Sequence, residues 1–333
     1  MKKSTLSVLL TLTLAISFVV CSALVSSAAP AWKFDRKIDF IVTFGVGSGT
    51  DTTMRPIASL LQDYLGVPVV ITNIEGANGW NGTDYALKQP ADGYTFYCGT
   101  QNQVIQYFLG NAPMDYLGES EPVCQLVHAT LLICASAKAA EGKYTNFTEM
   151  IEYAKAHPGE ISVGMMSRTG TDSVAFEAAT KGVDIAQISY GGGSEMFAAM
   201  AGGHLHLGMA GADEVGGLIA AGNIIPLLAL SENRLSILPN VECSKELGIE
   251  SYFGPWRGIF TRKGTPQEAI DALDYAVTQV IDKKEWQDFL LSGAYNERDG
   301  YKGNAEFKEF VKGEFDFYKK YLDELGALSP KFK

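Results

Sequence analysis

One stretch, Ile38–Asp51, constrains the fold of this chain more than any other. Apolar residues alternate at its start, and three closely spaced glycines then follow: Gly45, Gly47 and Gly49. The alternation predicts a β-strand, and the glycines allow a turn in which the backbone approaches a ligand closely. Apolar residues recur at helical spacing from Met54 to Leu65, with Thr50–Thr53 as candidate N-caps and Gly66 as the stop. The stretch therefore predicts a helix N-terminus at the end of a strand, an arrangement that binds anions.

Strands and helices continue to alternate along the chain, in two groups. The segments Glu121–Ala137 and Ser251–Thr261 are strand-rich and have no helical period, so we interpret them as crossings between two lobes. We expect residues 32–130 plus 256–333 to form lobe 1, and residues 131–255 to form lobe 2. Each lobe then has an α/β architecture with its strand-to-helix loops gathered at one edge.

Residues 1–28 have the layout of a secretory signal peptide. Two lysines precede an apolar run, and small residues follow as far as Ala31, so cleavage is expected after Ala28 or Ala31. Cys21 invites a lipid anchor, but Val20 is a poor residue before a lipid-modified cysteine. We expect a periplasmic protein without a lipid anchor. No later stretch is long and apolar enough to span a membrane.

The net charge of the chain disfavours some classes of binding partner. The 333 residues carry a net charge of −11, and loss of the two leader lysines makes this about −13. Such a surplus of negative charge disfavours nucleic acid and anionic membrane surfaces as partners.

Export permits disulfides, and Cys124 could pair with Cys134 if their strands are adjacent. Buried free thiols remain an equal alternative. Four cysteines lie outside the leader: Cys98, Cys124, Cys134 and Cys243.

A set of motifs resembles a known family. They are Phe44-Gly-Val-Gly-Ser-Gly-Thr-Asp51 with Arg55, Leu65–Asn73, Gly76–Gly82, Asp92–Thr95, Tyr190-Gly-Gly-Gly, Gly202–Gly208, and Gly264-Thr-Pro266. In order and spacing the chain is similar to the solute receptors of the tripartite tricarboxylate transporter family (TctC/Bug-type periplasmic binding proteins). The likeness covers nearly all of the chain after the leader.

The resemblance implies a fold and a function. The fold class would be α/β, the two-lobed periplasmic-binding-protein fold (type II) with two crossover strands between lobes. The protein would capture a small mono-, di- or tricarboxylate between its lobes and deliver it to an inner-membrane permease of one large and one small subunit. It would act as a monomer and perform no catalysis, with neither cofactor nor metal.

The resemblance also implies site residues in two turn–helix mouths and on the floor between them. The first mouth would comprise Phe44, Gly47, Ser48, Gly49, Thr50 and Asp51. The second would comprise Ser167, Thr169, Gly170, Thr171 and Ser173, with Arg168 as a possible clamp for a carboxylate. Further residues at strand ends are Asn102, Tyr190, Gly191, Ala210 and Asp213.

The chain departs from the family pattern at several of these positions. Thr43 stands where the family usually has proline, and Ser48-Gly49 where it usually has two glycines. Pro56 falls inside the first predicted helix and could delay or kink it. Arg168 adds a cation to the second mouth. These departures concern the identity of the ligand more than the mode of binding.

Other interpretations of the same residues stay open. The glycines at 45–49 loosely match a dinucleotide fingerprint, with Glu75 in the place of the ribose-binding acid, but NAD is scarce outside the cytoplasm. Asp51 can cap its helix instead of meeting a ligand. His204 and His206 could share a metal but lack an evident third ligand. Ser194 lacks the G-x-S-x-G elbow of an exported α/β hydrolase. A ligand-sensing protein would share both fold and site.

Overall fold

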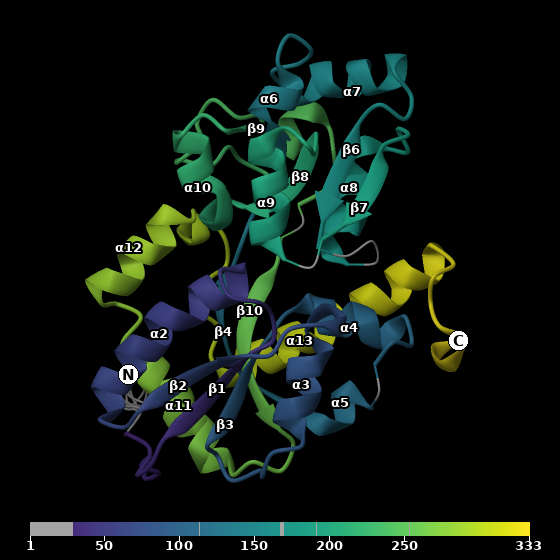
Figure 1. Cartoon of the computed structure of the whole chain (residues 1–333). Coiled ribbons are helices and arrows are strands. Elements are labelled where there is room, and N and C mark those ends of the chain that lie inside the picture. Colours follow the sequence, from purple (N-terminus) through teal and green to yellow (C-terminus); the bar gives the residue numbers. More distant parts are fainter. Residues whose placement is uncertain (1–28, 113, 167–169, 191, 253) are drawn as a thin grey trace, which may run out of the picture. The chain divides into compact units, whose positions relative to one another are not determined.

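Two five-stranded sheets, each covered by helices, make up the part of the chain that the structure describes (Figure 1). The computed structural model describes residues 29–333 except 113, 167–169, 191 and 253. The predicted signal peptide and Cys21 lie outside these residues. From Trp32 to Lys333 the chain forms one compact unit.

The first sheet is mixed. Its strands are β1 (Ile38–Val42), β2 (Val69–Asn73), β3 (Thr95–Gly99), β4 (Ser120–His128) and β10 (Trp256–Arg262). Their order is β2-β1-β3-β10-β4, with β1 parallel to β2 and β3, and β10 antiparallel to β3 and β4. The helices of this lobe are α2 (Gly49–Leu65), α3 (Trp80–Leu87), α4 (Gln101–Phe108), α5 (Tyr116–Glu119), α11 (Gln267–Thr278), α12 (Lys284–Ser292) and α13 (Asn304–Glu324). Short 3-10 turns are η1 (Ala77–Gly79), η3 (Tyr295–Glu297) and η4 (Pro330–Phe332).

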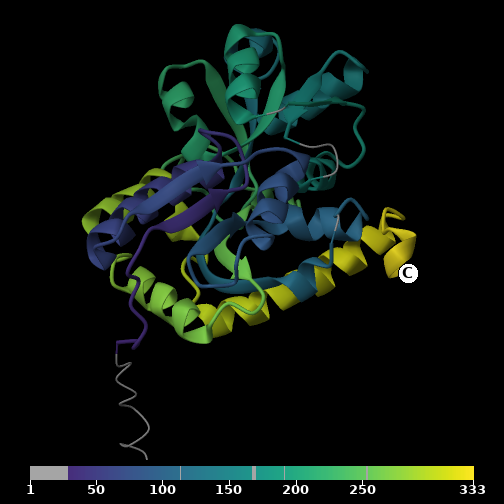
Figure 2. The ribbon, with the colours of Figure 1, turned by 60° about the horizontal axis from the view of Figure 1, so that its bottom comes forward.

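Both faces of the first sheet are buried. Phe40 belongs to a core shared with Met54 of α2, whereas the next residue, Ile41, belongs to a separate core with Trp80 of α3 and Phe307 of α13. Successive residues of a strand point to opposite faces, so helices on both sides explain why the central strands are almost continuously apolar. Figure 2 shows α13 running along the first lobe beneath its sheet.

The second sheet repeats this plan. Its strands are β5 (Leu131–Ser136), β6 (Ser162–Met165), β7 (Ala186–Ser189), β8 (Leu207–Gly211) and β9 (Ile224–Ala229), in the order β7-β6-β8-β5-β9. β6 is parallel to β7 and β8, and β5 is antiparallel to β8 and β9. The helices are α6 (Ala137–Ala140), α7 (Phe147–Ala156), α8 (Thr171–Thr180), α9 (Gly193–Gly202) and α10 (Ala212–Ala220), followed by the 3-10 turn η2 (Ser244–Leu247).

The chain crosses between the two sheets where the strand-rich segments predicted it. β4 of the first sheet is followed directly by β5 of the second, with Ala129 and Thr130 between them. The return runs from η2 to β10, whose Trp256 and Phe260 are buried in the first lobe's core. A further contact joins the lobes, in which Ser236 Oγ donates to Glu297 Oε1 at 2.6 Å.

The first helix starts earlier than the sequence suggested. Ser48, not a residue of Thr50–Thr53, is the N-cap of α2, and its hydroxyl accepts from Asp51 N at 3.4 Å. The helix continues through Pro56 and ends at Gly66, which has the left-handed conformation with φ 70°. The prediction of the N-cap was therefore wrong, while the predicted stop is confirmed.

Two open questions about the side chains receive answers. The four cysteines of the described part are buried free thiols, so the pairing of Cys124 with Cys134 does not occur. The ring of His206 contacts a neighbouring strand of its own sheet, since its Nδ1 lies 3.1 Å from Ser162 Oγ.

Among the described residues, no helix is both long and apolar enough to cross a bilayer.

Candidate ligand-binding cleft

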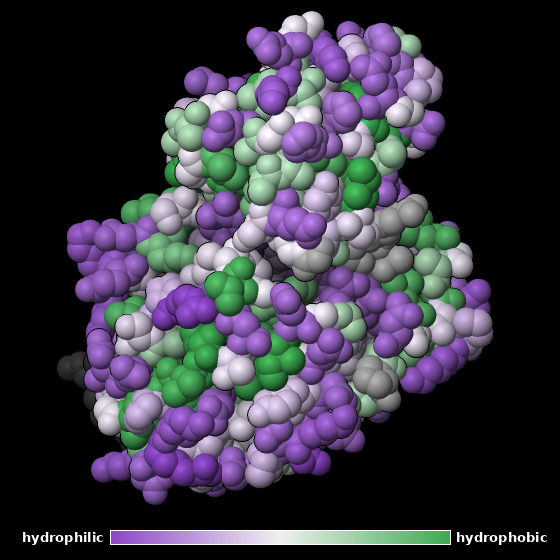
Figure 3. Space-filling view, viewed as in Figure 1, coloured by the Kyte–Doolittle hydropathy of each residue, from purple (hydrophilic) through white to green (hydrophobic). Residues whose placement is uncertain are grey.

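A cleft that is open to solvent lies between loops of the two lobes. Figure 3 shows a hollow along the seam between them. The first-lobe wall comes from the loop before α2, the start of α4 and the start of β10. The second-lobe wall comes from the starts of α8, α9 and α10 and from strand ends. Described residues that line the cleft are Phe44, Ser48, Gly49, Thr50, Thr100, Asn102, Leu131, Met166, Asp172, Gly193, Met196, Phe197, Met209, Glu214, Pro255 and Arg257.

Asp51 holds the first mouth together rather than facing the cleft. Its Oδ2 accepts from Gly47 N at 3.0 Å and from Arg55 Nε at 2.9 Å. Its Oδ1 accepts from Arg55 Nη2 at 2.8 Å and from Asn73 Nδ2 at 2.9 Å. Burial alone would raise the pKa of this carboxyl, but the hydrogen bonds from Arg55, Gly47 and Asn73 outweigh it and lower the pKa. Asp51 is therefore an ionised brace for the glycine-rich turn.

Thr43, the departure from the family's usual proline, fastens the strand ends beneath this mouth. Its hydroxyl donates to Cys98 O at 2.9 Å and accepts from Gln103 Nε2 at 3.2 Å. Gln103 in turn closes a capping box with Thr100 at the start of α4. A proline could make neither side-chain bond, so the threonine links β1, β3 and α4.

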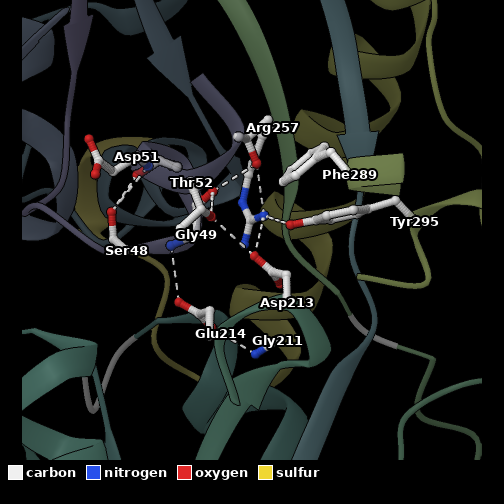
Figure 4. Close-up of polar contacts among 12 residues, drawn as sticks. Ser48, Gly49, Asp51, Thr52, Gly211, Asp213, Glu214, Arg257, Phe289 and Tyr295 are labelled. Carbon is white, nitrogen blue, oxygen red and sulfur yellow. Dashed lines mark hydrogen bonds and ion pairs between the residues drawn. The ribbon is translucent and has the colours of Figure 1, made fainter. Parts of the chain in front are cut away.

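Glu214 brings a carboxyl of the second lobe to the N-terminus of α2 (Figure 4). Its Oε1 accepts from Gly49 N at 3.0 Å, and its Oε2 accepts from Gly211 N at 2.7 Å. One carboxyl therefore bridges the first turns of α2 and α10 across the cleft. Burial, and next the charge of Asp213, raise the pKa of Glu214 to about 7.

Arg257 lies directly behind this bridge and is 3% exposed. Its Nη1 donates to Asp213 Oδ2 at 3.3 Å, to Thr53 Oγ1 at 3.0 Å and to the hydroxyl of Tyr295 (Figure 4). Burial would lower the pKa of Arg257, but the neighbouring Tyr295 and Asp213 outweigh it and raise the pKa. Arg257 and Asp213 therefore form a buried salt bridge between the lobes.

Glycine is required at the start of α2 because of this arginine. A Cβ on Gly49 would lie 1.8 Å from Arg257 Nη2, so a larger residue would force the guanidinium to move from its buried hydrogen bonds. The Ser48-Gly49 departure therefore has a local reason, since Ser48 caps the helix and Gly49 leaves room for the guanidinium.

The second mouth begins at Gly170, the N-cap of α8, and Asn102 of the first lobe pairs with the next residue. Thr171 donates from both its N–H and its hydroxyl to Asn102 Oδ1, each at 3.3 Å. Asp172 lines the cleft and accepts from Met166 N at 3.3 Å, and burial raises its pKa to about 6. The N-cap residue Gly170 has no side chain that could accept a hydrogen bond from the first turn of α8.

The structure brings together part of the predicted site. Five predicted residues line the cleft: Phe44, Ser48, Gly49, Thr50 and Asn102. Thr171, Ala210 and Asp213 are each adjacent in the chain to a lining residue, and Gly170 is the N-cap of α8. Ser173 instead directs its hydroxyl to Gln187 at 2.9 Å. Ser167, Arg168, Thr169 and Gly191 lie outside the described residues. Tyr190 packs at the edge of a second-lobe core.

Sequence reasoning missed the acidic and basic residues that join the lobes. Glu214 directly follows the predicted Asp213, but an acid in the first turn of a helix is common, so its position alone does not mark it. Arg257 stands alone in the apolar stretch SYFGPWRGIFT. A charge in a strand buried on both faces needs a partner, and this was the available signal.

Comparison with known proteins identifies the family. The model for the tripartite tricarboxylate transporter family receptor, TctC, matches residues 53–326. The chain belongs to this family. Protein BugT of Bordetella pertussis is 30% identical to this TctC receptor over 256 residues, which are 75% of this chain and 77% of BugT.

Solved structures agree with the family. R. palustris Rpa4515 with adipate superposes with a TM-score of 0.80 at 25% identity, over 88% of this receptor and 98% of that chain. The periplasmic binding protein BugD gives 0.78 at 21% identity, over 89% and 99% of the two chains, and shows the fold. The predicted family and two-lobed fold are confirmed. Because TctC proteins are binding proteins, this chain is a solute receptor and not an enzyme.

Proposed function

We propose that this receptor works in the periplasm, where it closes its two lobes over a small organic carboxylate. It then delivers the cargo to an inner-membrane permease of one large and one small subunit. The family name supplies the transport context, and adipate in the Rpa4515 structure supplies the ligand chemistry. The signal-peptide layout of residues 1–28 supports export, as does the periplasmic origin of BugD.

One observation carries the proposal: the starts of several helices from both lobes meet at one cleft. Gly49 of α2, Asn102 of α4, Asp172 of α8 and Gly193 of α9 all line it. Helix N-termini present N–H groups and the positive ends of helix dipoles, so their convergence favours a bound anion. The predicted residues of both mouths are our candidates for ligand contacts, together with Gly193.

Blocking the cleft tests this function. Gly193→Leu adds a branched side chain at a wall residue, where the nearest atom to its Cβ is Phe197 Cε2 at 3.1 Å. The matched control is Gly216→Leu in α10, because a Cβ there meets nothing within 4 Å. We expect carboxylates that raise the melting temperature of the wild type to lose this effect in Gly193→Leu and to keep it in Gly216→Leu.

Equal ligand-induced stabilisation in both variants would place the ligand outside this cleft. Delivery is tested separately, by measuring uptake of the identified ligand into membrane vesicles that contain the permease. Uptake should require the wild-type receptor and fail with Gly193→Leu.

A further inference from the structure

Apolar side chains dominate the walls of the cleft. Seven of its described lining residues are apolar, and they come from both lobes: Phe44, Leu131, Met166, Met196, Phe197, Met209 and Pro255. Methionine is unbranched and adaptable, so the methionines of these walls can fit themselves to an apolar ligand. Ligand pockets bury most of a small ligand's surface against walls of this kind. The cleft therefore suits a ligand with a sizeable apolar body.

The polar side chains of the first-lobe wall are largely engaged within the protein. The hydroxyls of Ser48 and Thr50 pair with each other at 2.9 Å, and the Thr100 hydroxyl donates to Gln103 Oε1 at 3.0 Å. Asn102 Oδ1 accepts twice from the first turn of α8, whereas its Nδ2 donates to no described residue. Among the described residues of this wall, the Asn102 amide is thus the side-chain donor left for a ligand.

No uncommitted cation lies among the described lining residues. Arg257 is their one basic residue, and it is paired with Asp213 at 3.3 Å. The acids Asp172 and Glu214 line the same cleft, each bound to backbone N–H groups. A second carboxylate on the ligand would therefore lack a counter-charge and would face like charges, which costs affinity.

We propose that the ligand of this receptor is a monocarboxylate with an apolar alkyl or aryl body, rather than a di- or tricarboxylate. The apolar walls cover the body, and the Asn102 amide donates to the single carboxylate. Closure of the lobes removes the body from water, which is the main favourable contribution to binding. This inference rests on the proposed function, because it narrows the ligand class of the same cleft.

Matched acids test the charge of the ligand by titration calorimetry at pH 8. In each pair a methyl group of the monocarboxylate stands in place of the second carboxylate: butanoate with succinate, pentanoate with glutarate, hexanoate with adipate, and 4-methylbenzoate with terephthalate. At pH 8 both lining acids are mostly ionised, because burial raises the pKa of Asp172 to about 6 and the pKa of Glu214 to about 7. In the pair that binds most tightly, we expect the monocarboxylate to bind roughly tenfold or more tightly than its dicarboxylate.

Chain length tests the apolar body. From butanoate to hexanoate, affinity should rise about fourfold with each added methylene, because each one is buried against the apolar walls. Hexanamide keeps the chain but lacks the charge. It should bind roughly tenfold or more weakly than hexanoate, since hydrogen bonds to a carboxylate are charge-assisted.

Met166→Gln tests the wall itself. Met166 is partly buried and lines the cleft, and glutamine has nearly the same length with a polar end. This variant should bind hexanoate roughly fourfold or more weakly than the wild type. Met114→Gln is the matched control, because Met114 is also partly buried but packs against the first-lobe core and is not a lining residue. It should leave binding unchanged.

The outcomes separate the inference from the proposed function. Dicarboxylates that bind as tightly as their matched monocarboxylates overturn the inference and leave the carboxylate receptor intact, as does an affinity that does not rise with chain length. If Met166→Gln binds hexanoate as Met114→Gln does, the apolar body lies elsewhere and the inference fails.

Two outcomes reach further. If hexanamide binds as tightly as hexanoate, the proposed function falls together with the inference, since the carboxylate is then not recognised. If none of the acids binds, the inference fails, and a wider carboxylate screen with Gly193→Leu and Gly216→Leu decides the proposed function. The wild-type comparisons hold even if Met166→Gln does not fold.

Discussion

Replacing Arg257 by methionine should destabilise the receptor by leaving a buried carboxylate without its counter-charge. Arg257 Nη1 bonds Asp213, Thr53 and Tyr295, and the side chains of Arg257 and Asp213 are only 3% and 4% exposed. Removal of one partner of a buried ion pair costs about 3–5 kcal/mol. Methionine fills much of the arginine's length, so the lost charge and hydrogen bonds dominate over a cavity.

The expected change in melting temperature follows from chain size. Unfolding entropy of about 2.1 cal/mol/K per residue, over about 300 folded residues, gives about 0.6 kcal/mol per degree. A loss of about 3–5 kcal/mol therefore lowers the melting temperature by about 5–8 °C. Calorimetry at pH 7 without ligand measures the shift.

Two variants make the result specific to the buried charge. Arg262→Met changes the same residue type in the same strand, where its Nη1 donates to Gln89 O at 3.0 Å, and should cost about 1 kcal/mol. Arg257→Met combined with Asp213→Asn removes the uncompensated carboxylate and should recover part of the lost stability. If Arg257→Met melts no lower than Arg262→Met, or if the double variant melts below the single one, the reasoning is refuted.

Two further predictions concern the same cluster. Gly49→Ala should lower the free energy of unfolding, measured with urea, by about 2 kcal/mol, because the new Cβ would overlap the Arg257 guanidinium. The control Gly216→Ala places its Cβ in open space on α10 and should stabilise the protein slightly. Equal effects of the two variants would contradict the close approach of Gly49 to Arg257. Glu214 has a pKa raised from 4.5 to about 7 in the folded protein, so the folded state holds its proton more tightly and stability should fall by about 3 kcal/mol as pH rises between those values. Glu214→Gln should remove this part of the pH dependence of unfolding, and an unchanged dependence would assign it to other groups.

Local patterns were sufficient to predict most of the fold. β1 and α2 followed from alternating and helical spacing around residues 38–65, and the two crossings followed from strand-rich segments without a helical period. These signals depend on neighbours in the sequence, so they survive without knowledge of the tertiary structure. α4 was missed because Gln101–Gln106 is mostly polar, although its Thr100–Gln103 capping box was present in the sequence.

The centre of the cleft could not be predicted in the same way. Glu214 and Gly49 are separated by 165 residues, and their contact exists only because α10 and α2 begin on opposite sides of one seam. The periodicity of α10 shows that Glu214 is in a first turn, but not which amide it meets. Likewise, the apolar surroundings of Arg257 show that it needs a partner without showing that the partner is Asp213.

Capping separates the helices of this receptor into two kinds. α2 and α4 have N-caps formed by serine, threonine and glutamine side chains, which pair with some of the donors of their first turns. α8 and α9 begin at glycine instead, and Thr171 in the first turn of α8 donates to Asn102 of the first lobe. A missing N-cap side chain therefore does not by itself leave a helix N-terminus free, since an acceptor from the other lobe can pair with its first turn. The glycine-rich turn before α2, the most conspicuous motif of the chain, thus also positions the lobes, because Gly49 N donates to Glu214 of the second lobe.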